Sequence, residues 1–276
     1  MKKIALITGA TRNIGRAISK EFAKAGYKII GTYRTGLLTP EGQAEFRKDI
    51  PDSELYQVDF CNEKSLSSFI NTIKENGIKI DALVNNAGVV SVTEEGVRNE
   101  FFNYNAKEFA DVVNCNFLAT ARLSIELKEN MNEGGGIVII SSVASQHGAY
   151  ATISYNASKA ALVNLAESLA ANYYRYKKVR VNVVSPGWID SEGGTMGADE
   201  TSTFMGRVAA VTPMQRNGKP EEVAKMVYFL MTENASFTTG ANIFVDGGYS
   251  MQNVNYLEEA GYAEFLITLK NDNKNY

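Results

Sequence analysis

The stretch KIALITGATRNIG, residues 3–15, decides the fold of this chain of 276 residues. Its apolar part, residues 3–8, is typical of a buried strand, and a helical pattern begins near residue 14. A glycine-containing turn between a strand and a helix places backbone N–H groups at the helix start, where the helix dipole also attracts phosphate. We interpret residues 8–15 as a loop that binds the pyrophosphate of a dinucleotide, with an ordinary strand–helix turn as the alternative.

One position in this loop departs from the expected glycine pattern. Gly9 and Gly15 are present, but the middle glycine is replaced by Arg12 at one possible spacing and by Asn13 at the other. Asparagine is the non-glycine residue that best tolerates a positive φ, because its short side chain forms local hydrogen bonds. We therefore expect Asn13 to adopt a left-handed conformation in a working loop.

The rest of the chain alternates between short apolar runs and longer helical patterns. Strands are predicted at 3–8, 28–33, 55–59, 81–84, 136–141, 179–184 and 242–245. Helices are predicted near 14–25, 40–49, 63–76, 106–130, 155–176 and 219–231. Apolar strands separated by helices are typical of a parallel sheet that is covered on both faces. We predict an α/β fold with a doubly wound, seven-stranded parallel sheet.

No linker or repeat divides this pattern, so we predict a single domain over residues 1–250. Two segments stand outside the alternation. Residues 188–218 are expected to form a substrate lid, because they contain Gly, Thr and Met and follow a strand. Residues 251–276 are expected to form a C-terminal extension with a frayed end.

The composition excludes several functional classes. A net charge of −3 provides no basic field for nucleic acid, and no apolar run is long enough to span a bilayer. There is no secretory signal pattern, and the two cysteines form no C-x-x-C pair. A single histidine argues against a histidine-based metal site. We expect a cytoplasmic protein with a small-molecule ligand and no metal, membrane or nucleic-acid partner.

The end of the second predicted strand, GTYRT (31–35), indicates which cofactor binds. A carboxylate at this point would bind the ribose hydroxyls of NAD and repel an added phosphate. Tyr33 and Arg34 occupy the position instead, and Arg12 lies in the loop nearby. Two guanidinium groups beside a neutral strand end suit a 2′-phosphate, so NADP(H) is favoured over NAD(H). Two solvated surface arginines are the alternative.

A second motif, YNASK, places Tyr155 and Lys159 on one face of a helix. Tyr155 follows a strand ending in ISS by a short loop, so it lies near the carboxyl end of that strand, where open α/β sheets bind ligands. Two further pairs with the same spacing lie late in the same helix, in a polar run that we expect to face solvent: Tyr173 with Lys177, and Tyr174 with Lys178.

Taken in order, these motifs resemble those of the short-chain dehydrogenase/reductase family in its single-domain form, with similarity to 3-oxoacyl-carrier-protein reductases. The resemblance is carried by TGATRNIG, Asp59, NNAG (85–88), NFLAT (116–120), IISS (139–142), YNASK (155–159), SPGWIDS (185–191), TPMQRNGKPEEVA (212–224) and GANIFVDGGYS (240–250). It implies a Rossmann-type fold and an NADP(H)-dependent oxidoreductase that interconverts a carbonyl and a secondary alcohol by hydride transfer. It also implies a homotetramer, or a homodimer, packed through 106–130 and 155–176.

The resemblance assigns four catalytic residues. Tyr155 would be the general acid or base, and the charge of Lys159 would favour its phenolate, because a free phenol titrates near 10. Ser142 would donate a hydrogen bond to the substrate oxygen, and Asn116 would hold a water that relays protons through Lys159. Two neighbours compete for these assignments, Ser141 for Ser142 and Asn114 for Asn116.

The resemblance also assigns ligand contacts. Asp59 and Phe60 would face the adenine, residues 86–88 the adenosine ribose, and residues 186–189 the nicotinamide. The full set of predicted cofactor contacts is Gly9, Thr11, Arg12, Asn13, Ile14, Tyr33, Arg34, Asp59, Phe60, Asn86, Ala87, Gly88, Tyr155, Lys159, Pro186, Gly187, Ile189 and Ser191. The candidate substrate contacts are Ser142, Gln146, His147 and Trp188, with a plain surface loop as the alternative for Gln146 and His147.

Departures from the family pattern leave the substrate open. The segment between NNAG and Asn116 is a few residues longer than is typical, and Ser191 stands where threonine is usual. Two other functions remain as alternatives: a non-catalytic nucleotide-sensing protein, and an enzyme that uses the same residues for enoyl reduction or dehydration. The intact pair of Ser142 and Tyr155 favours carbonyl chemistry.

Overall fold

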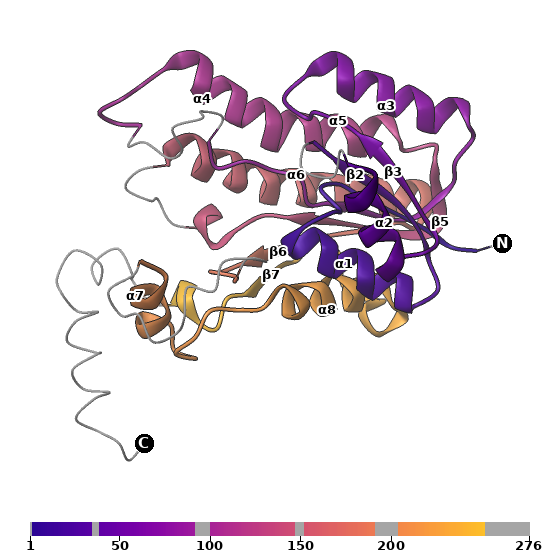
Figure 1. Ribbon diagram of the computed structural model, residues 1–276. Helices are drawn as coiled ribbons and strands as arrows, with labels where there is room; N and C mark the ends of the chain where they lie inside the picture. The colour runs from indigo at the N-terminus through magenta and orange to yellow at the C-terminus, as the bar shows by residue number, and fades with distance from the viewer. Residues whose placement is uncertain (1, 35–38, 92–99, 147–151, 191–203, 252–276) are drawn as a thin grey trace.

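A single parallel sheet forms the centre of the protein, as a computed structural model shows (Figure 1). The structure describes residues 2–34, 39–91, 100–146, 152–190 and 204–251. The strand order is β3-β2-β1-β4-β5-β6-β7, and every neighbouring pair is parallel. The strands are β1 (Ile4–Ile7), β2 (Lys28–Tyr33), β3 (Ser53–Gln57), β4 (Ile80–Asn85), β5 (Met131–Ile140), β6 (Arg180–Pro186) and β7 (Asn242–Val245). The predicted seven-stranded α/β fold is confirmed.

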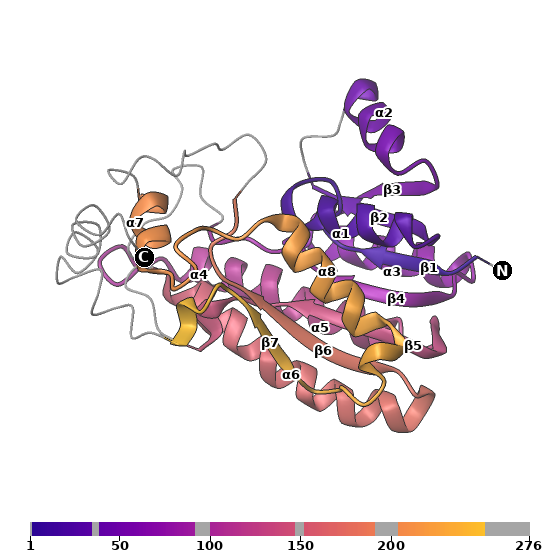
Figure 2. The same cartoon turned by 90° about the horizontal axis from the view of Figure 1, so that it is seen from below.

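Helices cover both faces of this sheet (Figures 1 and 2). The main helices are α1 (Asn13–Lys24), α2 (Pro40–Asp49), α3 (Glu63–Glu75), α4 (Ala106–Val113), α5 (Ala119–Glu126), α6 (Ile153–Lys177), α7 (Phe204–Val211) and α8 (Pro220–Met231). Four single turns complete the described helical structure: η1 (Asn114–Leu118), η2 (Val143–Ser145), η3 (Glu233–Ala235) and η4 (Tyr249–Met251).

The core consists of two apolar layers, one on each face of the sheet. Leu6 of β1 points into the layer under α3, α5 and α6, while Ala5 and Ile7 point into the layer under α1 and α8. Side chains alternate between faces along a strand, so a strand that is buried on both faces needs apolar residues at every position. This explains why β1 has the continuous apolar sequence IALI.

The structure corrects four element predictions. Strand β5 begins at Met131, before the predicted start at residue 136, and this first residue pairs with Ile80 of β4. The predicted helix 106–130 is two helices, α4 and α5, joined by the π-helical turn η1, and it ends at Glu126. Strand β3 begins at Ser53, before the predicted start, because its polar first residues pair with β2. Helix α7 lies within 188–218, where no helix was predicted. No helix in the described part of the chain is long and apolar enough to cross a membrane.

Candidate active site

The glycine-containing loop after β1 is tightly packed against the first turn of α1. Gly9 has a φ of 63° and Asn13 a φ of 47°, so the prediction of a left-handed Asn13 is confirmed. A Cβ atom on Gly15 would lie 2.0 Å from the Gly9 carbonyl oxygen. A side chain at position 15 would therefore push α1 away from the loop.

A set of hydrogen bonds joins this loop to the residues that follow β4. The Asn86 side-chain amide donates to the carbonyls of Thr8, at 2.9 Å, and Gly9, at 3.2 Å. The Thr8 hydroxyl accepts from the backbone N–H groups of Asn86 and Ala87, each at 2.9 Å. We call these contacts the Thr8–Asn86 clasp. They lie between β1 and β4, where the strand order reverses and where doubly wound sheets bind ligands.

A pocket of about 600 Å³ lies beyond the carboxyl ends of β2 and β3. Its lining side chains come from four segments of the chain: Arg34, Gln57, Asp59, Cys61, Ser65, Lys107 and Asp111. Arg34 and Asp59 were predicted cofactor contacts, whereas Lys107 was not, because it comes from the distant helix α4. Tyr33 is buried, and Phe60 packs against the core.

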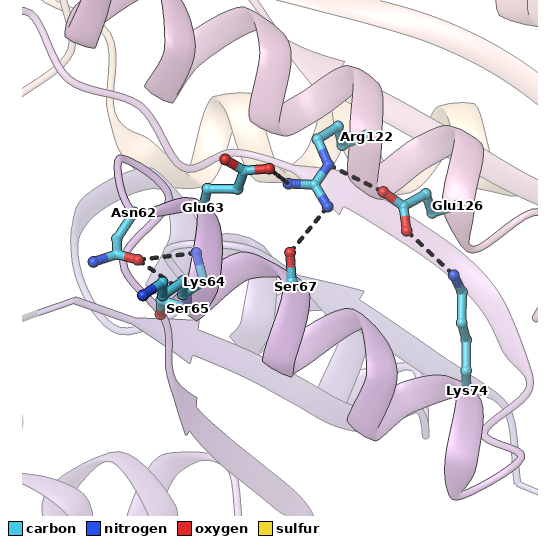
Figure 3. A network of polar contacts seen from close by, with 8 residues as sticks. All are labelled: Asn62, Glu63, Lys64, Ser65, Ser67, Lys74, Arg122 and Glu126. Carbon is cyan, nitrogen blue, oxygen red and sulfur yellow. Dashed lines mark hydrogen bonds and ion pairs between the residues drawn. The ribbon is translucent and has the colours of Figure 1, made fainter.

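Local hydrogen bonds fix the turn that carries Asp59 and Cys61 into this pocket. The Asp59 N–H donates to the Ser65 hydroxyl at 2.9 Å, and the Cys61 N–H donates to the Asp59 carboxylate at 3.0 Å. Asn62 caps α3 by accepting from the N–H groups of residues 64 and 65 (Figure 3). Arg122 of α5 then holds α3 in place through Ser67, at 3.1 Å (Figure 3).

The two cysteines meet at this end of the site although they are far apart in sequence. Hydrogen bonding with Cys115 lowers the pKa of the Cys61 thiol, and the nearby Arg34 guanidinium, 3.9 Å from the sulfur, acts in the same direction. The same contact, together with burial, raises the pKa of the Cys115 thiol. Cys115 is buried, and the sequence did not predict its contact with Cys61.

Tyr155 and Lys159 lie on α6 beside the carboxyl end of β5. The Lys159 ammonium lies 5.6 Å from the centre of the Tyr155 ring and donates to the Ile140 carbonyl at 2.9 Å. Burial lowers the pKa of Lys159 to about 8. Burial also raises the pKa of Tyr155, and this increase is opposed by a hydrogen bond with the Ser142 side chain. The predicted tyrosine, lysine and serine are therefore brought together.

The structure distinguishes Ser142 and Asn116 from their competing neighbours. The Ser141 hydroxyl is buried and donates to the Lys159 carbonyl at 2.8 Å, which turns it away from Tyr155. Asn114 is exposed, whereas Asn116 is only 1% exposed. A Cβ atom on Gly88 would lie 3.2 Å from the Asn116 side-chain oxygen and 3.4 Å from the Lys159 side-chain nitrogen. The NNAG segment therefore packs directly against the side chains of Asn116 and Lys159.

The amide of Asn116 connects three segments. It accepts from the Val89 N–H and donates to the Val89 carbonyl, both at 2.8 Å. It also donates to the Ser158 hydroxyl at 3.0 Å, which in turn donates to the Tyr155 carbonyl at 2.7 Å. Asn116 lies in the π-helical turn η1, and such turns often occur at functional sites.

Comparison with known proteins agrees with this arrangement. Residues 9–250 match the family model described as enoyl-(acyl carrier protein) reductase. The chain belongs to the short-chain dehydrogenase/reductase family. It is 34% identical over 250 residues to Protein FixR of Bradyrhizobium diazoefficiens, covering 89% of this chain and 86% of FixR. It is 31% identical over 253 residues to the 3-oxoacyl-(acyl-carrier-protein) reductase FabG of Escherichia coli, covering 90% and 98% of the two chains.

A solved structure of a related protein contains a cofactor. BdcA in complex with NADPH superposes with a TM-score of 0.75 at 31% sequence identity, covering 89% of this chain and 93% of BdcA. The similarity to the short-chain dehydrogenase/reductases therefore extends over the sheet and the helices that position the site.

The short-chain dehydrogenase/reductase fold brings a further segment, after β6, to the same edge of the sheet. Pro186 is buried, and a Cβ atom on Gly187 would lie 2.8 Å from the Asp246 Cα atom, so this glycine allows close packing beside β7. Ile189 pairs with Gly218 and packs against the core, next to the half-buried Trp188. Ser191 lies outside the described residues.

Gln146 and Asn86 have surroundings that the sequence did not predict. Gln146 is exposed and lines a separate pocket of about 330 Å³ between α6 and β7, while His147 lies outside the described residues. Asn86, one of the residues predicted to line the adenosine ribose, uses its side-chain nitrogen in the Thr8–Asn86 clasp.

The expectation that both additional Tyr–Lys pairs of α6 face solvent is wrong for Tyr173. This side chain is only 4% exposed, and its hydroxyl donates to the Ser124 carbonyl because this side of α6 packs on α5. Burial raises its pKa. Tyr174, by contrast, is 43% exposed, as expected. Among the described residues, no group of three or more His, Cys, Asp or Glu side chains could hold a metal ion.

Proposed function

We propose that this protein is an NADP(H)-dependent oxidoreductase that interconverts a carbonyl compound and a secondary alcohol. The observation that carries the proposal is the position of Tyr155, whose ring centre lies 5.6 Å from the buried Lys159 ammonium, with the Ser142 side chain beside it. Two groups that can donate to one substrate oxygen thus stand next to a positive charge. The family and the NADPH complex of BdcA support the same reaction class.

The residues at the sheet edge fit NADP(H). The backbone at Gly15 lies so close to that of Gly9 that a side chain at either position would fill the loop. The start of α1 offers N–H groups to phosphate. Arg34 offers a guanidinium for a 2′-phosphate, and Arg12 is an exposed second cation. When bound, the cofactor supplies or accepts the hydride. The other predicted contacts are Thr11, Asn13, Ile14, Tyr33, Asp59, Phe60, Asn86, Ala87, Gly88, Tyr155, Lys159, Pro186, Gly187, Ile189 and Ser191.

Each catalytic side chain has a role that follows from its surroundings. The raised pKa of Tyr155 keeps its phenol protonated near neutral pH, so it can donate a proton to the substrate oxygen. Ser142 donates a hydrogen bond to that oxygen as negative charge develops on it. Lys159 is mostly charged at pH 7, since its pKa is about 8, and this charge stabilises the phenolate that proton transfer leaves behind.

Replacement of Tyr155 tests the reaction. NADPH and NADH oxidation would be followed with ketones, β-keto thioesters and keto-sugars as substrates. Tyr155→Phe removes the proton donor and should lower kcat by roughly 10²- to 10⁴-fold. Tyr174→Phe, an exposed tyrosine on the same helix, is the matched control and should behave as wild type. Wild-type rates in Tyr155→Phe would contradict the mechanism.

The organisation of the whole chain is part of the proposal. Residues 1–250 would form one catalytic domain, with 188–218 as a substrate lid and 251–276 as an extension. Residues 191–203 of the predicted lid and residues 252–276 of the extension lie outside the described residues. A homotetramer, the assembly that the family resemblance implies, stays a prediction that light scattering on the purified protein would test.

A further inference from the structure

Glu100 connects the long segment between β4 and α4 to the start of the helix that carries Tyr155. Its carboxylate accepts a hydrogen bond from the Ser154 backbone N–H at 2.6 Å, and its second oxygen accepts from the Ser154 hydroxyl. The two residues are 54 positions apart, and Ser154 is completely buried. Ser154 directly precedes Tyr155, so the contact acts on the first turn of α6.

The start of α6 needs such a partner. The first N–H groups of a helix have no acceptor within the helix, and a negative charge beside them is stabilised by the helix dipole. Thr152 occupies the N-cap position but forms no side-chain capping bond, and the first turn of α6 contains no acidic residue. Glu100 supplies both an acceptor and a negative charge from another part of the chain.

The second turn of α6 is fixed by different contacts. Asn116 donates to Ser158, and Ser141 donates to the Lys159 carbonyl, which ties this turn to η1 and β5. Tyr155 therefore lies between two attachment points. The attachment of the second turn involves the proposed catalytic residues Asn116 and Lys159. The attachment of the first turn is made by Glu100, which is not one of the proposed catalytic residues.

We propose that Glu100 is a positioning residue for Tyr155. By holding the first turn of α6, it keeps the Tyr155 hydroxyl in contact with Ser142, without itself touching substrate or cofactor. This gives a role to the long segment between NNAG and Asn116 that the reaction does not otherwise use. The inference rests on the proposed function of Tyr155.

Glu100→Gln is the direct test. The amide is nearly isosteric, but it has no charge, and an NH2 donor replaces one of the two carboxylate oxygens that accept from Ser154. Misplacement of a catalytic group should lower kcat by roughly tenfold or more. The Kd of NADPH should stay within about twofold of wild type, because the Thr8–Asn86 clasp holds the cofactor loop without help from Glu100. Glu100→Asp keeps the charge and should recover part of kcat.

Glu108→Gln provides the matched control. Glu108 also lies in the first turn of a helix, α4, and comes from the same part of the chain, but its carboxylate accepts a local hydrogen bond from the Asn105 side chain. Its substitution should leave kcat and NADPH binding unchanged. Loss of NADPH binding in Glu100→Gln in proportion to its loss of kcat would overturn the positioning role.

Amide hydrogen exchange separates this inference from the proposed function. In Glu100→Gln, the Ser154 N–H no longer donates to a charged carboxylate, so the amides of residues 152–158 should exchange faster than in wild type. In Glu108→Gln, exchange of these amides should match wild type. Unchanged exchange together with wild-type kcat would overturn the inference. If the wild-type protein reduces no carbonyl compound, the proposed function fails, and exchange alone then decides whether Glu100 holds the first turn.

Discussion

At Asn13 the backbone has a φ of 47°, a conformation that most side chains resist. The residue occupies the position where the loop pattern expects glycine, and its short amide side chain allows that backbone shape to persist. The neighbouring Gly15 has no such freedom, because even a methyl group there would collide with the Gly9 carbonyl. The loop therefore tolerates a departure from glycine at one position and not at the other.

Substitution of Asn13 should separate backbone shape from side-chain chemistry. Asn13→Gly should bind NADPH with a Kd within about threefold of wild type, because glycine adopts positive φ freely. Asn13→Val should weaken binding by roughly tenfold or more, because a β-branched residue at this φ costs about 1–3 kcal/mol. Fluorescence titration with NADPH measures both values. Equal affinity of the two variants would show that the left-handed backbone is not required.

The pKa of Lys159, about 8, predicts two effects of pH. The kcat/KM for carbonyl reduction should be constant from about pH 6 to 7.5 and fall above about pH 8, as Lys159 loses the charge that stabilises the phenolate. Stability should change in the opposite direction. An unfolded lysine titrates near 10.4, so the unfolded state binds more protons between about pH 8 and 10, and the free energy of unfolding rises across this window.

Lys159→Met distinguishes these effects from those of other groups. The variant should lack the rise in stability between about pH 8 and 10, measured by urea denaturation, and should have little activity at any pH. A rise of equal size in the variant would mean that another group titrates in this window.

At the scale of elements, apolar patterning located the buried strand β2 and also the half-buried edge strand β7. The run 28–33 forms β2 and the run 242–245 forms β7, with the predicted bounds. Strand β3 was placed too late because its sequence, SELYQ, is amphipathic, and its first residues are strand only through the ladder with β2. The interruption of helix 106–130 was missed because no Gly or Pro marks it. Asn116, at the interruption, is held by Val89 and Ser158 from other elements.

For the candidate site too, the sequence predicted the contacts between residues close in the chain and missed those between distant residues. Tyr155 and Lys159 are one helical turn apart, so their proximity follows from local geometry. The position of Ser142 beside them followed from the resemblance to the family. The contacts of Glu100 with Ser154, and of Cys61 with Cys115, join residues that are distant in sequence and that no spacing rule relates. They exist because the parallel sheet brings the ends of all its strands to one edge.

At the scale of the whole molecule, an acidic chain with a net charge of −3 must bind a more strongly anionic cofactor. Local cations at the sheet edge have to provide the attraction. Arg34 lies in the pocket beyond β2 and β3, and its first role would be to distinguish a 2′-phosphate from a hydroxyl.

Arg34→Ala should raise the KM for NADPH by roughly 10- to 100-fold, because a hydrogen bond to a charged group contributes about 1.5–3 kcal/mol. The KM for NADH should change little, and the preference between the two cofactors should fall accordingly. Arg47→Ala, which removes the same charge from the exposed side of α2, is the control. Equal loss with both cofactors would mean that Arg34 does not contact a 2′-phosphate.

Every bond of the Thr8–Asn86 clasp joins two parts of the chain itself. Because these bonds tie the loop to the residues after β4, we expect that little entropy is lost in ordering the loop when the cofactor binds. Association should then be a single bimolecular event, with a rate that increases linearly with NADPH concentration and shows no plateau. Stopped-flow fluorescence would detect this, and any slow step in the catalytic cycle would have to come from elsewhere in the molecule.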